Sequence, residues 1–295
     1  METEAEAAEM LSGNGQAGCV GTVDELVAIM GAAGIQNSVL AVAVPTRAMY
    51  DTLSRKGRQG GSLREETVIA GISEHIKGRN EWACRTARTH HGLVPFIALD
   101  PIMGTQEMVA ELKDKFENYG AGGIKLHPGL GHYFPDDPRL WPVYEAAASL
   151  ELPVLSHGGL CAAPESYTRP RNYDKVLEAF PNLTLIVAHL GRIHFKETLA
   201  LAANYPNVYF DTSSAVPGDA NGEKLDHAET FLGPLQTNDE VVEVIRSIGA
   251  HRVLFGTDYP WFHPGRDLRR FSRLGFTKEE SRAILGENAR RILGL

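Results

Sequence analysis

Seven short apolar runs recur along the 295 residues, and a segment with helical periodicity separates each run from the next. Runs that are apolar throughout are typical of strands buried on both faces, as in a parallel sheet covered by helices. The repeated order of strand and helix therefore predicts an α/β fold. The runs are GIQNSVLAVAVP (34–45), LVPFIALDP (93–101), GGIKLHP (122–128), LPVLSHGG (152–159), LTLIVAHLG (183–191), NVYFDTS (207–213) and RVLFGTDYP (252–260).

A charged or metal-binding type of residue lies at the carboxyl end of most of these runs. In a parallel barrel all such ends converge on one face, where the active sites of this architecture lie. An open doubly wound sheet places ligands only near the point where the strand order reverses, so it does not explain polar residues at nearly every strand end. The pattern therefore favours a barrel. The residues are Lys125, His127, His157, His189, Asp211 and Asp258.

The start of the chain departs from this pattern. No apolar run precedes the first helical segment, TVDELVAIMGAAG, in which Thr22 and Glu25 have the spacing of a capping box. Since a closed barrel of this kind needs eight strands, we predict a distorted (β/α)8 TIM barrel with a missing or atypical first strand. We expect residues 1–21 to be an atypical or disordered segment and residues 22–295 to be one barrel domain with C-terminal helices. The polar segment 46–92 is expected to be a loop followed by a helix.

Composition excludes several classes of partner. The formal net charge is -8 and no Lys/Arg-rich stretch occurs, which argues against nucleic acid and anionic membranes and leaves a small-molecule substrate. Three cysteines without CxxC spacing argue against a disulfide framework and a zinc ribbon. The chain has neither a basic leader with an apolar core nor eighteen consecutive apolar residues, so we expect a cytoplasmic protein without a membrane segment.

His157, His189 and Asp258 occupy equivalent strand ends. Two imidazoles and a carboxylate are a common ligand set for zinc or another divalent ion, which lowers the pKa of bound water towards about 7. We predict metal ligation by His157 and Asp258, in preference to a core histidine and a turn-forming aspartate. For His189, metal ligation and a hydrogen bond to the attacking water or the substrate are both open. Asp258 also has the chemistry of a catalytic base.

Lys125 and His127 are candidate substrate-binding residues. Lys125 lies inside an apolar strand, where an unpaired ammonium is costly. It pairs with a carboxylate, holds a substrate carboxylate, or is carbamylated and bridges two metals. His127 faces the same site if the strand pleat is regular. Asp211 either supports the site or caps the segment that follows, and the two glycines after His157 would let the backbone approach a ligand closely.

The motifs GIKLHP, VLSHGG, YTRPRNYDKVLEAFPNLTLIVAHLG, NVYFDTSS, RVLFGTDYPW and ENARRIL occur in this order. From about Thr22 onwards the chain resembles the amidohydrolase-related (amidohydrolase 2) family of metal-dependent TIM-barrel hydrolases and decarboxylases. The resemblance implies a divalent metal, zinc ahead of iron or manganese, held by a His-x-His pair on the first strand, a histidine on the fifth and an aspartate on the eighth. His157 and Asp258 match the last two, and His189 matches a sixth-strand histidine that stands beside the metal or binds a second one. A homodimer is also implied.

This sequence has no His-x-His before Thr22. Three explanations are open. The first strand is lost or replaced, or the metal is held by His157, His189 and a modified Lys125, or the protein works without metal, as some related lactonases are thought to do.

The leading functional prediction is a metal-dependent hydrolase. Metal-activated water would attack an amide, ester, thioester or lactone carbonyl, with Asp258 as the base and His189 orienting the water. The alternative is a metal-dependent carboxy-lyase acting on a small aromatic or unsaturated acid, or a metal-free lactonase. The third hypothesis is a catalytically inactive barrel. The sequence does not identify the substrate, because the loops after the strands determine specificity in a barrel.

Overall fold

The computed structural model describes residues 19–60, 64–159, 165–216 and 237–295. Its centre is one sheet of seven parallel strands, which pair in chain order from β1 to β7. Each strand falls within one of the seven predicted runs, so this prediction is confirmed. The strands are β1 (Ser38–Ala41), β2 (Leu93–Ala98), β3 (Gly123–Leu126), β4 (Val154–Ser156), β5 (Leu185–Val187), β6 (Val208–Asp211) and β7 (Val253–Leu254).

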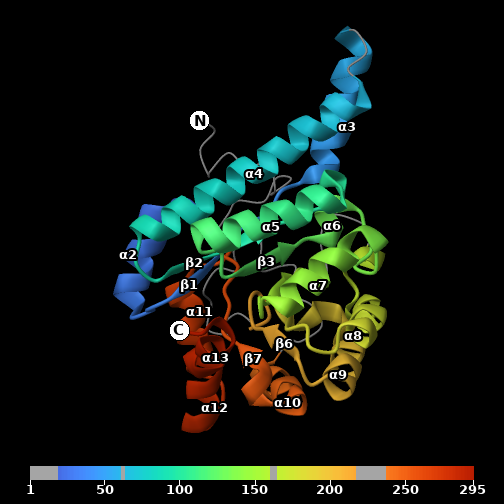
Figure 1. Ribbon diagram of the computed structural model, residues 1–295. Coiled ribbons are helices and arrows are strands. Elements are labelled where there is room, and N and C mark those ends of the chain that lie inside the picture. The colour runs from blue at the N-terminus through green and yellow to red at the C-terminus, as the bar shows by residue number, and fades with distance from the viewer. Residues whose placement is uncertain (1–18, 61–63, 160–164, 217–236) are drawn as a thin grey trace.

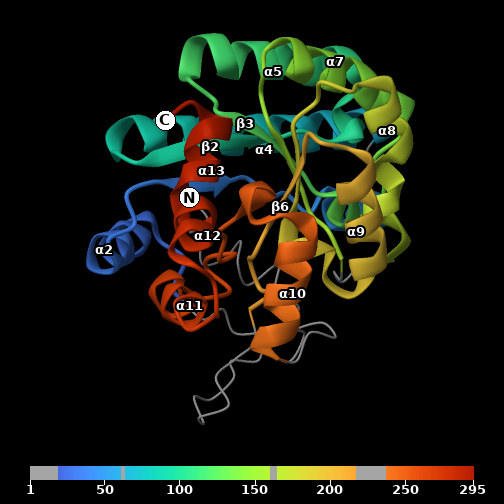
Figure 2. The ribbon, with the colours of Figure 1, turned by 90° about the horizontal axis from the view of Figure 1, so that it is seen from below.

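Helices surround the sheet on its outside (Figures 1 and 2). Helix α4 packs on β2, α5 contacts both α4 and α7, and α9 contacts α10. This order around the sheet follows the order in the chain. The helices are α2 (Val23–Ala33), α3 (Thr46–Gly60), α4 (Glu65–Thr89), α5 (Thr105–Tyr119), α6 (Pro128–Gly131), α7 (Trp141–Ser149), α8 (Asp174–Ala179), α9 (Phe195–Asn204), α10 (Asn238–Ile248), α11 (Pro264–Phe271), α12 (Lys278–Arg282) and α13 (Asn288–Leu293).

The connection between β1 and β2 differs from the prediction of a loop and one helix. It contains two helices, α3 and α4, and α4 runs along the sheet (Figure 1). Val68, Ile72 and Ile76 recur at intervals of four residues on α4, and all three are buried. Such spacing places apolar side chains on one face of a helix, which here packs against β2.

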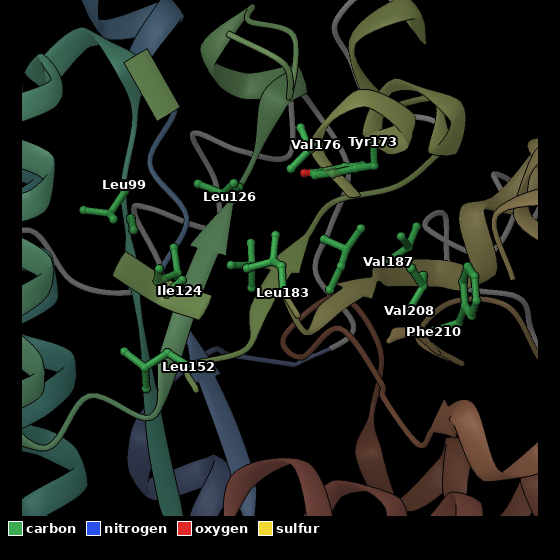
Figure 3. Close-up of a cluster of buried hydrophobic side chains, with 14 of the residues drawn as sticks. Leu99, Ile124, Leu126, Leu152, Tyr173, Val176, Leu183, Val187, Val208 and Phe210 are labelled. Atoms are coloured by element: carbon green, nitrogen blue, oxygen red, sulfur yellow. The ribbon is translucent and has the colours of Figure 1, made fainter. Parts of the chain in front are cut away.

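The core lies between the sheet and the helices, as Figure 3 shows for part of it. Ile124, Leu126 and Phe210 are fully buried there. Burying each such side chain stabilises the fold by about 1.5–3 kcal/mol. Close contact between strands also constrains the sequence, because a Cβ at Gly123 would lie 2.4 Å from the ring of Phe96 on β2.

The sheet is a partial barrel, and no strand among the described residues pairs with both β7 and β1 to close it. Strand β1 alternates half-buried and exposed residues, with Val39 38% exposed, because β2 alone pairs with it among the described strands. Helix α2 lies beside this seam. Thr22 caps it as predicted, and the Tyr259 hydroxyl, beyond β7, donates to Glu25 over 2.6 Å. The prediction of a distorted barrel is confirmed by the seven parallel strands of the described part. Residues 1–18, on which the prediction of a missing or atypical first strand falls, lie outside that part.

Two smaller observations concern the described residues. No helix in the described part combines the length and the apolar character needed to cross a membrane. Cys19 and Cys84 form no disulfide within the described part, and Cys161 lies outside it.

Candidate active site

Three of the predicted site residues meet at the carboxyl ends of the central strands. His127, His157 and His189 follow β3, β4 and β5 respectively, and we call them the histidine cluster. The His157 ring stacks on His127, with centroids 4.1 Å apart and planes at 13°. Its other neighbour is His189, which it meets edge-on at 4.7 Å. Nδ1 of His157 and Nε2 of His189 are 3.2 Å apart. The two histidines that end neighbouring strands therefore lie side by side, as the sequence predicts.

The hydrogen bonds of His189 determine which ring nitrogen carries its proton. Nδ1 lies 3.0 Å from the Ser213 carbonyl, an acceptor, so we assign the proton to Nδ1. Nε2 then presents a lone pair towards His157. Asp211 accepts the backbone N–H of His189 over 3.0 Å and also the backbone N–H and hydroxyl of Ser213. Of the two roles left open for Asp211, these contacts favour support of the site.

His127 is oriented by its own loop. Its Nδ1 accepts the backbone N–H of Leu130 over 3.2 Å, at the start of α6. Nε2 is therefore the protonated nitrogen of the neutral ring, and it is available to donate a hydrogen bond. This arrangement is compatible with the predicted role of His127 in binding substrate.

The backbone after β5 adopts an uncommon conformation. His189, Leu190 and Arg192 have φ values of 62°, 50° and 47°, in the left-handed region that costs a non-glycine residue about 1–2 kcal/mol. The Thr198 hydroxyl holds this turn by donating to the Leu190 carbonyl over 2.9 Å. Asp258 also has a positive φ, of 60°. Such strain is retained where surrounding contacts impose it, and it concentrates at functional sites.

The two glycines after His157 have a packing role, beside the predicted approach to a ligand. A Cβ at Gly158 would lie 2.7 Å from Val187 and 2.8 Å from the Ala188 carbonyl. A Cβ at Gly159 would lie 2.5 Å from that of Arg192. The glycines therefore allow the loop after β4 to pack against the loop after β5, which brings His157 to His189.

Lys125 is buried on β3, and the charges of Asp258 and Asp211 act on it. Burial lowers the pKa of its ammonium, and the two carboxylates partly oppose this effect. Within the described residues, however, no carboxylate lies within the 4.0 Å of a direct ion pair with Lys125. Of the three interpretations of Lys125, direct pairing with a carboxylate is therefore not seen among the described residues. Asp258 and Asp211 act on the ammonium only through their charges, at longer range.

Asp258 lies beyond β7 and is exposed. The protein around its carboxyl group raises its pKa, while Lys125 and Arg192 oppose the rise. Because the side chain is exposed, water limits this effect. Asp258 can therefore exchange a proton with solvent while it remains close to the buried Lys125.

His127 and His189 are neutral at neutral pH. Burial lowers the pKa of His189 well below its usual value, and the cations Arg192 and Lys125 lower it further. Burial also lowers the pKa of the half-buried His127, with smaller effects from His157 and Lys125. Neutral imidazoles offer a lone pair to a metal or to a donor on a ligand.

The positions of His157 and His189 fit a shared divalent ion. Two nitrogens bound to one ion at about 2.0–2.1 Å are about 3.0–3.4 Å apart, which includes the observed 3.2 Å. The contact between His189 Nδ1 and a carbonyl is the support that metal-binding histidines usually have. Among the described residues no three His, Cys, Asp or Glu side chains are grouped closely enough to hold an ion. The complete set of His157, His189 and Asp258 therefore stays a prediction.

Sequence reasoning missed two residues, Thr46 and Asp100. They follow β1 and β2 and line a cavity together with Lys125 and His127. The Asp100 carboxylate accepts the Thr46 hydroxyl over 2.7 Å and the Ile102 N–H over 2.9 Å. Asp100 ends the run LVPFIALDP just as His157 ends its own, so the rule that selected the other residues would have found it. Thr46 carries no such signal because it begins a helix.

Comparison with known proteins adds three findings. The model of a family described as amidohydrolase matches residues 50–295. A curated relative, the 2-amino-3-carboxymuconate-6-semialdehyde decarboxylase of Dictyostelium discoideum, is 24% identical over 218 residues, which is 66% of this chain. The chain spans 59% of that relative's length.

Solved structures share the fold at low identity. An uncharacterised TIM-barrel protein of Bordetella bronchiseptica is 20% identical, with a TM-score of 0.71 over 98% of this chain and 92% of its own. A dihydroxybenzoic acid decarboxylase of Polaromonas, solved with manganese and an inhibitor, is 16% identical, with a TM-score of 0.62 over 93% and 86% of the two chains.

Proposed function

Because the chain belongs to the amidohydrolase family, we propose that it is a metal-dependent carboxy-lyase acting on a small aromatic or unsaturated carboxylic acid. Two of the similar proteins named above are decarboxylases, one for 2-amino-3-carboxymuconate 6-semialdehyde and one for a dihydroxybenzoic acid. They favour the second of the predicted reactions. Hydrolysis, the leading prediction from the sequence, has no such support.

The observation that carries the proposal is the histidine cluster beside the buried Lys125. His157 and His189 would hold a divalent ion, with Asp258 completing the set. The bound ion would supply positive charge that polarises the substrate carboxylate and a neighbouring oxygen. Manganese has more support than the zinc that the sequence favoured, because the Polaromonas enzyme holds manganese.

The side chains have distinct roles in this proposal. Lys125 and the Nε2–H of His127 bind and orient the carboxylate. When carbon dioxide leaves, the electron pair of the broken C–C bond stays on the substrate carbon. Asp258 in its protonated form, not bound to the ion, gives that carbon a proton, which forms the new C–H bond. Its carboxylate then ligates the ion or regains a proton from water, because it is exposed.

The test compares two panels of substrates on the purified protein loaded with manganese. Hydroxybenzoates and 2-amino-3-carboxymuconate 6-semialdehyde are assayed for carbon dioxide, and esters, lactones and amides for acid. We expect carbon dioxide from at least one member of the first panel, loss of that activity with a chelator and recovery with manganese. Activity that survives complete metal removal would contradict the metal-dependent step.

Two variants make the test specific to the site. His157→Ala should lose both activity and bound manganese, the latter measured by elemental analysis. His91→Ala is the matched control, since His91 is exposed just before β2, at the opposite end of the sheet. Acid from the second panel without carbon dioxide from the first would establish a hydrolase or lactonase instead. Folded protein inactive on both panels would leave the inactive-barrel hypothesis.

A further inference from the structure

A cavity lies beside the histidine cluster, at the carboxyl ends of β1, β2 and β3. Val42, Val44, Ile76 and Leu99 contribute apolar walls. The space inside is that of about one water molecule. It is therefore large enough for a small substituent of a ligand and too small for an aromatic ring.

Asp100 is the acceptor on one side of this cavity. It is 8% exposed, and the two contacts described above, from Thr46 and Ile102, both use its carboxylate as an acceptor. A carboxylate has about four lone-pair sites, so about two remain, and it has no donor to offer while ionised. A group that binds to it here has to bring its own hydrogen, as a hydroxyl or an amino group does.

The loop after β3 is shaped around this carboxylate. A Cβ at Gly131 would lie 2.4 Å from Oδ2 of Asp100, and Gly131 ends α6, the helix that follows His127. A glycine at this position leaves the space that the carboxylate occupies. The arrangement links Asp100 directly to the loop that orients His127.

Lys125 is the donor on the other side of the same cavity. Its ammonium is buried and, as noted, has no direct ion pair with a described residue. Burial of a cation without a close partner is costly, so an anionic ligand that neutralises it would be stabilised. A carboxylic acid with a hydroxyl or amino substituent complements both sides of the cavity, because it combines an anion for Lys125 with a donor for Asp100.

We propose that this cavity is a specificity subsite that receives a hydroxyl or amino substituent of the substrate. Asp100 accepts the hydrogen bond from that substituent, and Thr46 holds the carboxylate in place. This inference rests on the proposed function, because it takes the ligand to be a carboxylic acid. The small space and the absence of a free donor on Asp100 select against methoxy and methyl substituents.

The test measures binding, so that it does not depend on turnover. Affinities of the manganese-loaded protein for benzoate and for its 2-, 3- and 4-hydroxy, amino and methoxy derivatives are determined by calorimetry. We expect at least one hydroxy or amino derivative to bind about tenfold tighter than benzoate and its methoxy counterpart. Asp100→Asn should abolish this preference while leaving the affinity for benzoate nearly unchanged. Asp114→Asn, on the outer helix α5, is the matched control and should keep the preference.

A second variant covers the case in which Asp100→Asn does not fold. Ala43→Val adds two methyl groups to the half-buried cavity wall and leaves Asp100 in place. It should weaken the preferred derivative more than benzoate. Equal affinities for all derivatives, no binding of any substituted acid, or an equal loss for all ligands in the variants would overturn the subsite. None of these depends on carbon dioxide release, so the subsite and the decarboxylation can fail separately.

Discussion

The histidine cluster and the Thr46–Asp100 cavity lie side by side at the same end of the sheet, yet their polar groups are satisfied differently. In the cluster, His189 contacts His157 and Ser213, and Asp211 holds the backbone of both His189 and Ser213. In the cavity, Asp100 keeps acceptor capacity, and Lys125 has no direct ion pair within the described residues. His157 and His189 are thus held by contacts within the protein, and His127 keeps one N–H to donate. In the cavity, both Asp100 and Lys125 keep capacity for a ligand.

This difference indicates a division of roles. A network whose members bind one another fixes geometry, which catalysis requires. Buried polar groups with unused hydrogen-bonding capacity instead increase the affinity for a ligand that binds to them. Changes in the cluster should therefore affect every substrate, and changes around the cavity should affect selection or affinity. The predictions below test this distinction, from the largest expected effect to the smallest.

The largest effect is expected for His189→Ala. This variant removes the imidazole between His157 and Ser213, and we expect kcat to fall at least about 100-fold for every substrate. Circular dichroism verifies that the variant folds. His251→Ala, an exposed position, serves as the control and should retain full activity. If kcat of the His189→Ala enzyme stayed within tenfold of the original value, the catalytic role of the cluster would be contradicted.

Lys125→Gln tests the residue that lies between the two regions. Loss of the ammonium should raise KM about 10-fold or more, with a smaller change in kcat, because the ion pair with the substrate carboxylate is lost. Steady-state kinetics of both variants, with Lys113→Gln on the exposed face of α5 as the control, separates the two constants. An unchanged KM would exclude Lys125 from substrate binding.

Asn80→Ala tests how the end of β2 is held. The Asn80 side chain accepts the N–H of Ala98 over 2.7 Å and donates to its carbonyl and to Glu111, each over 3.0 Å. Truncation leaves these buried groups unsatisfied, so we expect the free energy of unfolding to fall by about 2–3 kcal/mol. Chemical denaturation measures it, with the exposed Asn118→Ala as the control. A loss as small as that of the control would show that Asn80 does not support the cavity.

The smallest effect is expected far from both regions, at the pair of Arg246 on α10 and Glu280 on α12. The hydrogen bonds from Arg246 and the Thr277 backbone lower the pKa of Glu280 from 4.5 to about 2. The ionised carboxylate therefore stabilises the fold above about pH 4.5, and this contribution is lost as the pH falls towards 2. Glu280→Gln should lower Tm by about 1–2 °C at pH 7 and by less at pH 3. A difference that grows on acidification would contradict this sign.

Much of the fold was predictable because each strand lies within one short apolar run of the sequence. Each run forms two to six hydrogen-bonded residues within the predicted bounds. The exposure of Val39 was not predictable, because it depends on whether another strand pairs with β1. The same limit applies to Gly158, whose need for close approach arises from a loop some thirty residues away in the chain.

The candidate site was predictable in part for a related reason. The convergence of strand ends places His157 and His189 at the same end of the sheet, and the close packing of their loops then brings the two rings together. The support from Ser213 was missed, because it depends on the path of the chain after β6. Asp100 was missed although it ends its apolar run as the selected residues end theirs, so its position at the site was open to prediction.

The central claim is that the histidine cluster supports metal-dependent loss of carbon dioxide. The most direct measurement follows a carboxyl-¹³C-labelled acid, the best substrate from the panel, in the manganese-loaded protein. We predict one labelled carbon dioxide per substrate consumed, and no labelled gas from His157→Ala protein that folds but no longer binds manganese. Substrate consumption with the label retained in an acid product, or undiminished gas release by His157→Ala, would contradict it.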